Sequence, residues 1–167
     1  AYGNGKRMVE QMCALAPEVE TVIARCFSFI GPHLPLDGRF AAGNFLRDAV
    51  DGKSITIHGD GRAVRSYLHA ADLTIWLLTL LLNGKDGRAY NVGGAEMVTI
   101  GELARLVSAS CQQRPEVALP NSRNAASPNL YVPDVTRAAS ELGLRPIIGL
   151  EEAVTRTIAW MESVELK

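Results

Sequence analysis

The chain has 167 residues, of which 47% are apolar and 21% charged, which is typical of a globular protein rather than a disordered or fibrous one. Its 17 Lys and Arg residues nearly balance its 18 Asp and Glu residues, and the net charge of −1 gives no electrostatic basis for binding nucleic acid or an anionic membrane. The longest apolar run, Leu73 to Leu82, is about half of what a membrane span needs, and no signal peptide is visible.

The predicted elements mix helices and strands along the whole chain. The β-branched and aromatic run 21–30, followed by Gly-Pro, is typical of a buried strand that leads into a loop. Asp72 stands at the N-cap position of an apolar helix, and Thr99 and Glu102 form a T-x-x-E capping box. In chain order we expect helix 2–15, strand 21–30, helix 40–50, strand 54–58, extended segment 64–69, helix 73–82, strand 89–92, helix 99–110, strand 116–119, helix 134–143 and helix 149–164.

Two further expectations concern burial. Spacing places five residues of helix 73–82 in the core: Trp76, Leu77, Leu78, Leu80 and Leu81. The three cysteines are odd in number and widely separated, and Cys13 and Cys26 lie in apolar runs. Buried thiols in a reducing cytoplasm are therefore expected, rather than disulfides or a metal site.

Tyr2 and Lys6 stand four residues apart at the start of the first predicted helix, so both side chains share one helix face. A nearby cation favours the charged form of an acid, which would make the Tyr2 hydroxyl a general base. A deprotonated phenol opposite a hydride acceptor is the apparatus for oxidising a secondary alcohol. The spacing by itself favours a solvated first helical turn, because Tyr and Lys fall four residues apart by chance in most proteins.

Six motifs in order resemble the second half of an extended short-chain dehydrogenase/reductase of the nucleotide-sugar epimerase/dehydratase kind. They are Y-G-N-G-K, A-R-C-F-S-F-I-G-P, the long segment I-T-I-H-G-D-G-R-A-V-R-S-Y-L-H-A-A-D-L, Y-N-V-G-G, the T-x-x-E-L-A helix, and D-V-T-R-A-A-S-E-L-G-L-R-P. The family's glycine-rich G-x-x-G-x-x-G loop is absent, as are the Ser/Thr that assists the Tyr and the Asp-Glu pair of 4,6-dehydratases. The chain is therefore expected to be a C-terminal portion.

The resemblance implies an α/β fold: the C-terminal part of a Rossmann-fold, NAD(P)-binding protein with a small mixed α/β substrate-binding domain. Residues 1–33 are expected to be a remnant of the Rossmann domain, comprising the catalytic helix and one strand. Residues 34–167 are expected to be mostly the substrate-binding domain, with Rossmann-packing elements near 65–92. The implied cofactor is NAD or NADP, bound mainly by an N-terminal half.

The resemblance also assigns roles to particular residues. Tyr2 and Lys6 are implied as the catalytic pair and, together with Phe27, as cofactor-binding residues. Ser28 stands where the family usually has Asn, a diphosphate contact. Arg65 follows a G-D-G turn, where its fork-shaped guanidinium suits a diphosphate; a surface Arg is the alternative. The implied substrate-binding residues are Ser28, Asn44, Phe45, Thr56, Ile57, His58, Arg65 and Arg123.

Alternatives remain for several of these residues. Gly43-Asn44-Phe45 opens a predicted helix, where simple capping and phosphate binding use the same groups. His58 is either a nucleobase contact or an exposed residue at a strand end. His69 and Asp72 are expected to be structural.

The implied function is that of the substrate-binding and catalytic-tyrosine portion of an epimerase or 4,6-dehydratase. Such an enzyme acts on a UDP- or dTDP-hexose in cytoplasmic surface-polysaccharide synthesis, by transient oxidation of a sugar hydroxyl. The alternative is a non-catalytic nucleotide-sugar-binding or assembly module. Expected partners are the nucleotide sugar and a second copy of the chain, because an exposed sheet edge and relatives that dimerise both favour a homodimer or other self-association. No nucleic-acid or membrane partner is expected.

Overall fold

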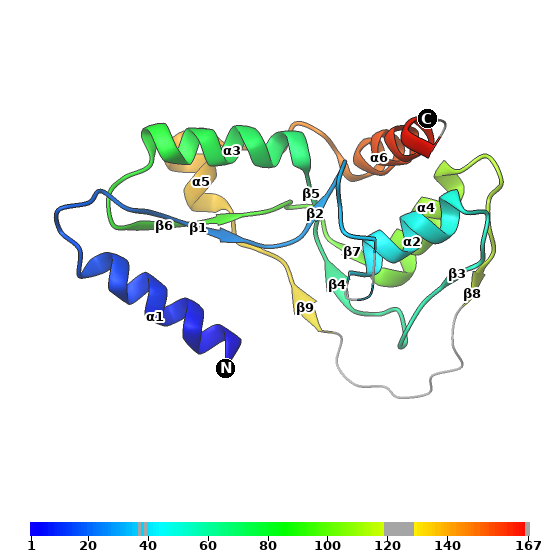
Figure 1. Cartoon of the computed structure of the whole chain (residues 1–167), viewed down its shortest axis with the longest axis horizontal. Coiled ribbons are helices and arrows are strands. Elements are labelled where there is room, and N and C mark those ends of the chain that lie inside the picture. Colours follow the sequence, from blue (N-terminus) through cyan, green and yellow to red (C-terminus); the bar gives the residue numbers. More distant parts are fainter. Residues whose placement is uncertain (37, 39, 119–128, 166–167) are drawn as a thin grey trace.

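The computed structural model describes residues 1–36, 38, 40–118 and 129–165. The elements, labelled in Figure 1, are α1 (Tyr2–Ala14), β1 (Val22–Cys26), β2 (Phe29–Ile30), α2 (Ala41–Val50), β3 (Ile55–Thr56), β4 (Val64–Arg65), β5 (Leu68–His69), α3 (Ala70–Asn83), β6 (Arg88–Val92), β7 (Val98–Thr99), α4 (Ile100–Ser110), β8 (Val117–Ala118), β9 (Leu130–Tyr131), α5 (Thr136–Leu142) and α6 (Leu150–Glu165).

One part of the fold is built on the parallel pair β1–β6, whose register runs from Val22 opposite Arg88 to Cys26 opposite Val92. Helices α3 and α5 lie on one side of this pair and α1 lies on the other (Figure 1). Parallel strands covered by helices are typical of α/β proteins. The buried cluster between the pair and α3 and α5 consists of Leu68, Trp76, Leu80, Tyr90, Val92, Ala138 and Leu144.

The second part holds the larger buried cluster, to which α2, α4 and α6 contribute most residues. These three helices pack against one another beside the short pairs β3–β8 and β2–β5, both of which are parallel. Phe45, Leu46, Leu103, Val107 and Val154 are among its most buried side chains. The two clusters draw on interleaved stretches of the chain, and the expected division at residue 33 stays a prediction.

The three-stranded sheet β7-β4-β9 brings distant segments together. Strand β4 pairs antiparallel with β7 and parallel with β9, so that Arg65 lies opposite both Val98 and Tyr131. Figure 1 shows β9 between the β1–β6 pair and the second part of the fold. A residue on β9 can therefore reach both parts.

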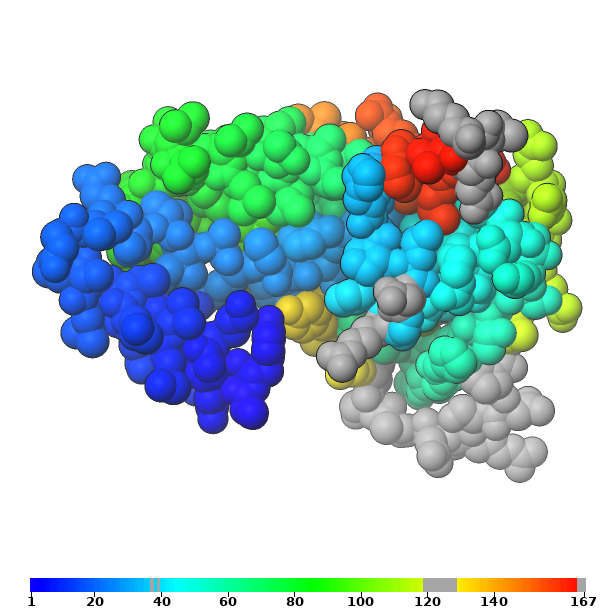
Figure 2. All heavy atoms as spheres, in the orientation of Figure 1, coloured from blue at the N-terminus to red at the C-terminus, as the bar shows by residue number. Residues whose placement is uncertain are grey.

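Helix α1 contains no buried residue. A bidentate ion pair between Glu10 of α1 and Arg25 of β1 links the helix to the strand. In the space-filling view, α1 forms the dark blue protrusion at the lower left, with the yellow atoms of the β9 region beside it (Figure 2). Its exposed apolar side chains include Met8, Val9 and Met12, and Leu15 at its C-cap is exposed as well.

Most predicted helices and strands are found, but four details of the sequence analysis are wrong. The run 21–30, predicted as one buried strand, forms the two strands β1 and β2, and Ile30 is its one buried residue because helices leave the end of β1 uncovered. The N-cap of α3 is His69, whose Nδ1 accepts the Ala71 N–H; Asp72 is buried and instead accepts the N–H groups of Ile147 and Ile148, both at 3.0 Å. Leu77, Leu78 and Leu81 are exposed, because only one face of α3 packs on β1, β2 and β5; Trp76 and Leu80 are buried as predicted. Cys26 is exposed at the end of β1, whereas Cys111 is buried.

Candidate functional site

A pocket of about 740 Å³ lies between α1 and β1, and we call it the Tyr2 pocket. Tyr2 and Lys6 line it from the first two turns of α1, and Phe27 and Tyr131 line it from the opposite side. As predicted from their spacing, the two α1 side chains are neighbours, with the Lys6 ammonium 5.6 Å from the centre of the Tyr2 ring. Tyr2 is 81% exposed, so its hydroxyl is open to a ligand in this pocket.

A second pocket, of about 500 Å³, opens between the β1–β2 connection, the start of α2 and strand β4, and we call it the Arg65 pocket. Three predicted substrate-binding residues, Ser28, His58 and Arg65, line it together. They are separated in sequence by up to 37 positions, from residue 28 to residue 65. The rest of the lining is mainly apolar and aromatic, including Phe29, Leu34, Phe40, Tyr67 and Ile100.

The two pockets adjoin, because Phe27 lines both of them. Its backbone N–H donates to the Val92 carbonyl at 3.0 Å, which extends the β1–β6 ladder by one residue. Its Cβ packs against Gly93, where an added Cβ would lie 3.2 Å away. Phe27, predicted as a cofactor-binding residue, is thus placed at the boundary between the Tyr2 and Arg65 pockets.

Arg65 is held along one edge of its guanidinium. Its Nη1 donates to the carbonyls of Val64 at 2.8 Å and Asn129 at 2.9 Å, and its guanidinium carbon lies 5.8 Å from the centre of the Tyr131 ring. Among the residues that the structure describes, Nε and Nη2 make no hydrogen bond. These N–H groups provide donors in the fork geometry that suits a phosphate or carboxylate.

Tyr67 provides a neutral hydroxyl beside this guanidinium. Burial raises the pKa of Tyr67 to about 12, although Arg65 acts in the opposite direction. The side chain is placed by a close backbone approach, because a Cβ at Gly94 would overlap the Tyr67 carbonyl. The second glycine of Y-N-V-G-G therefore lets the segment after β6 approach the Tyr67 backbone closely. The Tyr67 hydroxyl remains a donor at neutral pH.

Four other predicted substrate-binding residues do not line either pocket. The side chains of Phe45 and Ile57 are 2% and 1% exposed and belong to the larger core cluster. Asn44 Nδ2 donates to the Gly38 carbonyl at 3.4 Å, and its Oδ1 accepts from Arg47. Thr56 is exposed on β3. Phe45 and Ile57 are thus core residues, because their side chains pack in the cluster to which α2, α4 and α6 contribute most residues.

Arg123 lies outside the described residues. Tyr67 and Tyr131, by contrast, line the pockets but were not singled out from the sequence. Tyr67 follows Arg65 by two positions on an extended segment, a spacing that puts both side chains on one face and could have identified it. No local signal could have identified Tyr131, because its place depends on the pairing of β9 with β4.

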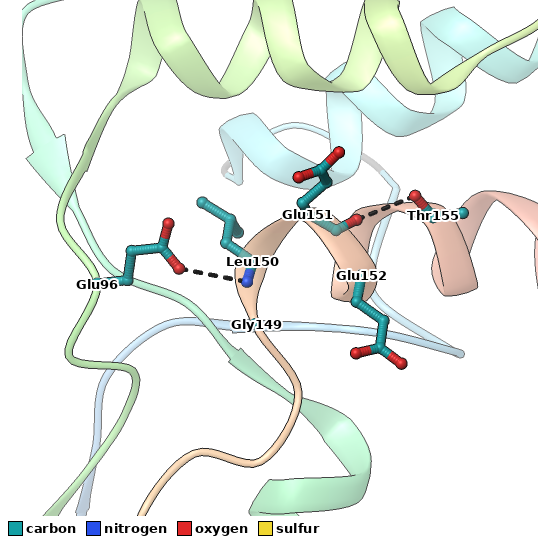
Figure 3. Close-up of a pocket in the computed structure, with 6 residues that line it drawn as sticks. All are labelled: Glu96, Gly149, Leu150, Glu151, Glu152 and Thr155. Atoms are coloured by element: carbon teal, nitrogen blue, oxygen red, sulfur yellow. Dashed lines mark hydrogen bonds between the residues drawn. The ribbon is translucent and has the colours of Figure 1, made fainter.

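A separate hollow at the start of α6 contains none of the predicted site residues (Figure 3). Glu96, Glu151 and Glu152 line it, and the Glu96 carboxylate accepts the Leu150 N–H at 3.4 Å. This carboxylate caps the helix, where negative charge is favourable. Helix capping therefore accounts for the Glu96 carboxylate in this hollow.

Within the described ranges, no three or more His, Cys, Asp and Glu side chains are grouped so as to hold a metal ion. No helix among the same residues has the length and apolar character needed to span a membrane.

Comparison with known proteins gives one family and a consistent set of relatives. Residues 1–93 match the family described as "NAD dependent epimerase/dehydratase family". UDP-glucuronic acid decarboxylase 1 of Danio rerio is 30% identical over 163 residues, which are 95% of this chain and 38% of that protein. dTDP-glucose 4,6-dehydratase of Actinoplanes sp. is 28% identical over 149 residues, which are 85% of this chain and 44% of that protein.

Among solved structures, UDP-glucose 4-epimerase of Thermotoga maritima with UDP-glucose matches with a TM-score of 0.83 at 24% identity, over 98% of this chain and 54% of that one. The likeness confirms the predicted α/β Rossmann-type fold. The chain spans about two-fifths of the length of these curated relatives, from 38% to 44%.

Proposed function

Since the chain belongs to the NAD-dependent epimerase/dehydratase family, as its sequence motifs predicted, we propose that it is the nucleotide-sugar-binding and catalytic-tyrosine portion of an NAD(P)-dependent enzyme. The substrate would be a UDP- or dTDP-linked hexose. The observation that carries the proposal is the adjacency of two pockets through Phe27, one with Ser28, His58 and Arg65 and the other with Tyr2 and Lys6.

The Arg65 pocket supplies the chemistry that a nucleoside diphosphate requires. The Arg65 guanidinium offers its donors to the diphosphate, and the Ser28 hydroxyl lies in the same lining. His58 and the aromatic ring of Phe40 provide a surface for the base. The apolar remainder of the lining excludes water, which strengthens the charge-assisted contacts.

The Tyr2 pocket supplies the proton chemistry. In this step the Tyr2 phenolate accepts the proton of a sugar hydroxyl and becomes a neutral phenol, and the Lys6 ammonium beside the ring offsets the negative charge that the phenolate carries before the transfer. The pocket donors fit NAD, because a hydroxyl, an ammonium and the Arg7 side chain together suit a group rich in hydroxyls and phosphates. NAD, when bound, supplies the acceptor and donor of hydride.

Epimerisation and 4,6-dehydration both begin with this oxidation, and they are the first candidates for the whole enzyme. Decarboxylation of a UDP-linked sugar acid is a second candidate, favoured by the 30% identity to UDP-glucuronic acid decarboxylase 1 over 95% of this chain. The 4-keto sugar that oxidation forms also serves this reaction, because a carbonyl β to the carboxylate accepts the electron pair when CO₂ leaves. Cytoplasmic surface-polysaccharide synthesis is the proposed setting.

The proposal is tested by calorimetric titration of the chain with UDP and with dTDP. Arg65→Ala is expected to weaken binding of the preferred nucleotide by about 2 kcal/mol or more, because a charge-assisted contact is lost. Arg62→Ala is the matched control, since Arg62 is an exposed arginine on the same segment that lines neither pocket. Equal affinities in both variants and the unmodified chain would contradict the proposed role of the Arg65 pocket.

A further inference from the structure

Tyr131 lies between two groups that belong to different pockets. Its ring packs against the Phe27 ring, with centroids 4.7 Å apart and an interplanar angle of 30°. The Arg65 guanidinium lies over the same ring, 5.8 Å from its centre. The three side chains come from the end of β1, from β9 and from β4, segments that are far apart in the sequence (Figure 1).

The backbone around Tyr131 is fixed on both sides of the residue. Tyr131 pairs with Arg65 in the parallel β4–β9 ladder. Two residues later, Pro133 packs on Gly93, where an added Cβ would lie 2.8 Å from its ring. The Asn91 side chain then donates to the Asp134 carbonyl at 2.8 Å. The ring is therefore presented by a segment tied to β4 on one side and to β6 on the other.

The ring and the two carbonyls together determine the orientation of the Arg65 guanidinium. The carbonyls of Val64 and Asn129 hold Nη1, and the aromatic face supports the plane of the cation. An arginine over an aromatic face is attracted by the ring quadrupole. The N–H groups of Nε and Nη2 remain available to a ligand. Because the Arg65 side chain is already held in place, it loses little further conformational entropy when the ligand binds.

We propose that Tyr131 is a positioning residue that holds the Arg65 guanidinium in its anion-binding orientation. This inference rests on the proposed function, because it assigns to Tyr131 part of the affinity of the Arg65 pocket for the diphosphate of a nucleoside diphosphate. The aromatic ring is the part of Tyr131 that performs this role, because the Arg65 guanidinium lies over the ring and the ring packs against Phe27.

The test compares Tyr131→Leu with Tyr131→Phe, by calorimetric titration with UDP and with uridine, and with dTDP and thymidine. Tyr131→Leu is expected to weaken nucleoside diphosphate binding about two- to fivefold, while nucleoside binding is unchanged. Tyr131→Phe keeps the ring and is expected to match the unmodified chain. In an Arg65→Ala background, Tyr131→Leu is expected to have no further effect, because the two residues act as one unit.

The outcomes separate this inference from the proposed function. Equal loss of nucleoside and nucleoside diphosphate affinity in Tyr131→Leu would mean that the ring only shapes the pocket, and would overturn the positioning role. If Tyr131→Leu weakened nucleoside diphosphate binding as much in the Arg65→Ala background as in the unmodified chain, the positioning role would be overturned as well. Failure of the unmodified chain to bind either nucleoside diphosphate would contradict the proposed function and this inference together. Circular dichroism of each variant verifies that it is folded.

Discussion

The Arg25 guanidinium on β1 donates two hydrogen bonds to the Glu10 carboxylate on α1, from Nε to Oε1 at 2.8 Å and from Nη2 to Oε2 at 2.6 Å. Because α1 buries no residue, this pair is important for holding Tyr2 and Lys6 beside the pocket. An exposed pair contributes less than about 1 kcal/mol to global stability. Loss of the Arg25–Glu10 pair is therefore expected to free α1 from β1 without a large change in the melting temperature of the protein.

The docking of α1 is expected to depend on pH. Hydrogen bonding from Arg25 lowers the pKa of Glu10 below its ordinary value of 4.5. The pair therefore contributes fully above that value, and its contribution is lost as the pH falls below it. An NMR pH titration of the α1 amide signals should show that α1 separates from β1 at acid pH in the unmodified chain. In Glu10→Gln the same separation should already be present at pH 7. Glu18→Gln, at an exposed site without an ion pair in the described structure, is the control; undocking in both variants or in neither would contradict the prediction.

Gly94→Ala is expected to destabilise the fold and to impair the Arg65 pocket. The added Cβ would overlap the backbone carbonyl of Tyr67, and the segment around Tyr67 or the one around Gly94 would have to move. Overpacking of this kind costs about 1–3 kcal/mol. Gly5→Ala is the matched control, because no atom lies within 4 Å of its added Cβ. Urea denaturation monitored by circular dichroism measures the stability of both variants. Equal urea midpoints for Gly94→Ala and Gly5→Ala would contradict the prediction and show that the segments around Gly94 and Tyr67 separate easily.

The sequence predicted best those features that depend on near neighbours. The Thr99–Glu102 capping box is present with both of its hydrogen bonds, and Tyr2 and Lys6 are adjacent on one helix face. Ser28 and Arg65 line one pocket although 37 positions separate them, and only the family resemblance pointed to both; their roles as substrate contacts stay predictions.

The features that sequence reasoning missed depend on long-range packing. The exposure of Leu77, Leu78 and Leu81 depends on which face of α3 is covered, and an apolar helix provides no polar face to mark it. Tyr131 reaches the site through a strand pairing with a partner 66 positions away, residue 65. Phe45 and Ile57 have an apolar character that fits a core as well as a pocket, and packing decides between the two.

The chain alone is expected not to bind NAD with micromolar affinity. No G-x-x-G-x-x-G sequence occurs in it, and that loop with its following helix provides the pyrophosphate contacts of dinucleotide-binding folds. Calorimetric titration with NAD provides the measurement, with UDP as the positive control. Micromolar NAD affinity would mean that Tyr2, Lys6 and Arg7 alone hold the cofactor.

Self-association is expected at micromolar concentrations. Leu81 and Leu82 on α3 are 76% and 78% exposed. Together with Leu77, Leu80 and Val22 they form the apolar part of a groove that Glu20 and Asp86 also line. A contiguous exposed apolar surface of this kind favours association in water. Leu81→Lys should reduce the sedimentation-equilibrium mass, whereas Met97→Lys, at another exposed apolar site, should not. A monomeric unmodified chain would contradict the expectation.

The most direct test of the central claim is a crystal structure of the chain with UDP or dTDP bound. We expect the diphosphate within hydrogen-bond distance of Arg65 Nε or Nη2 and of the Ser28 hydroxyl, with the base near His58 and the free end directed past Phe27 towards Tyr2. A nucleotide bound elsewhere, with the Arg65 pocket filled only by water, would contradict the assignment of this pocket to a nucleotide sugar.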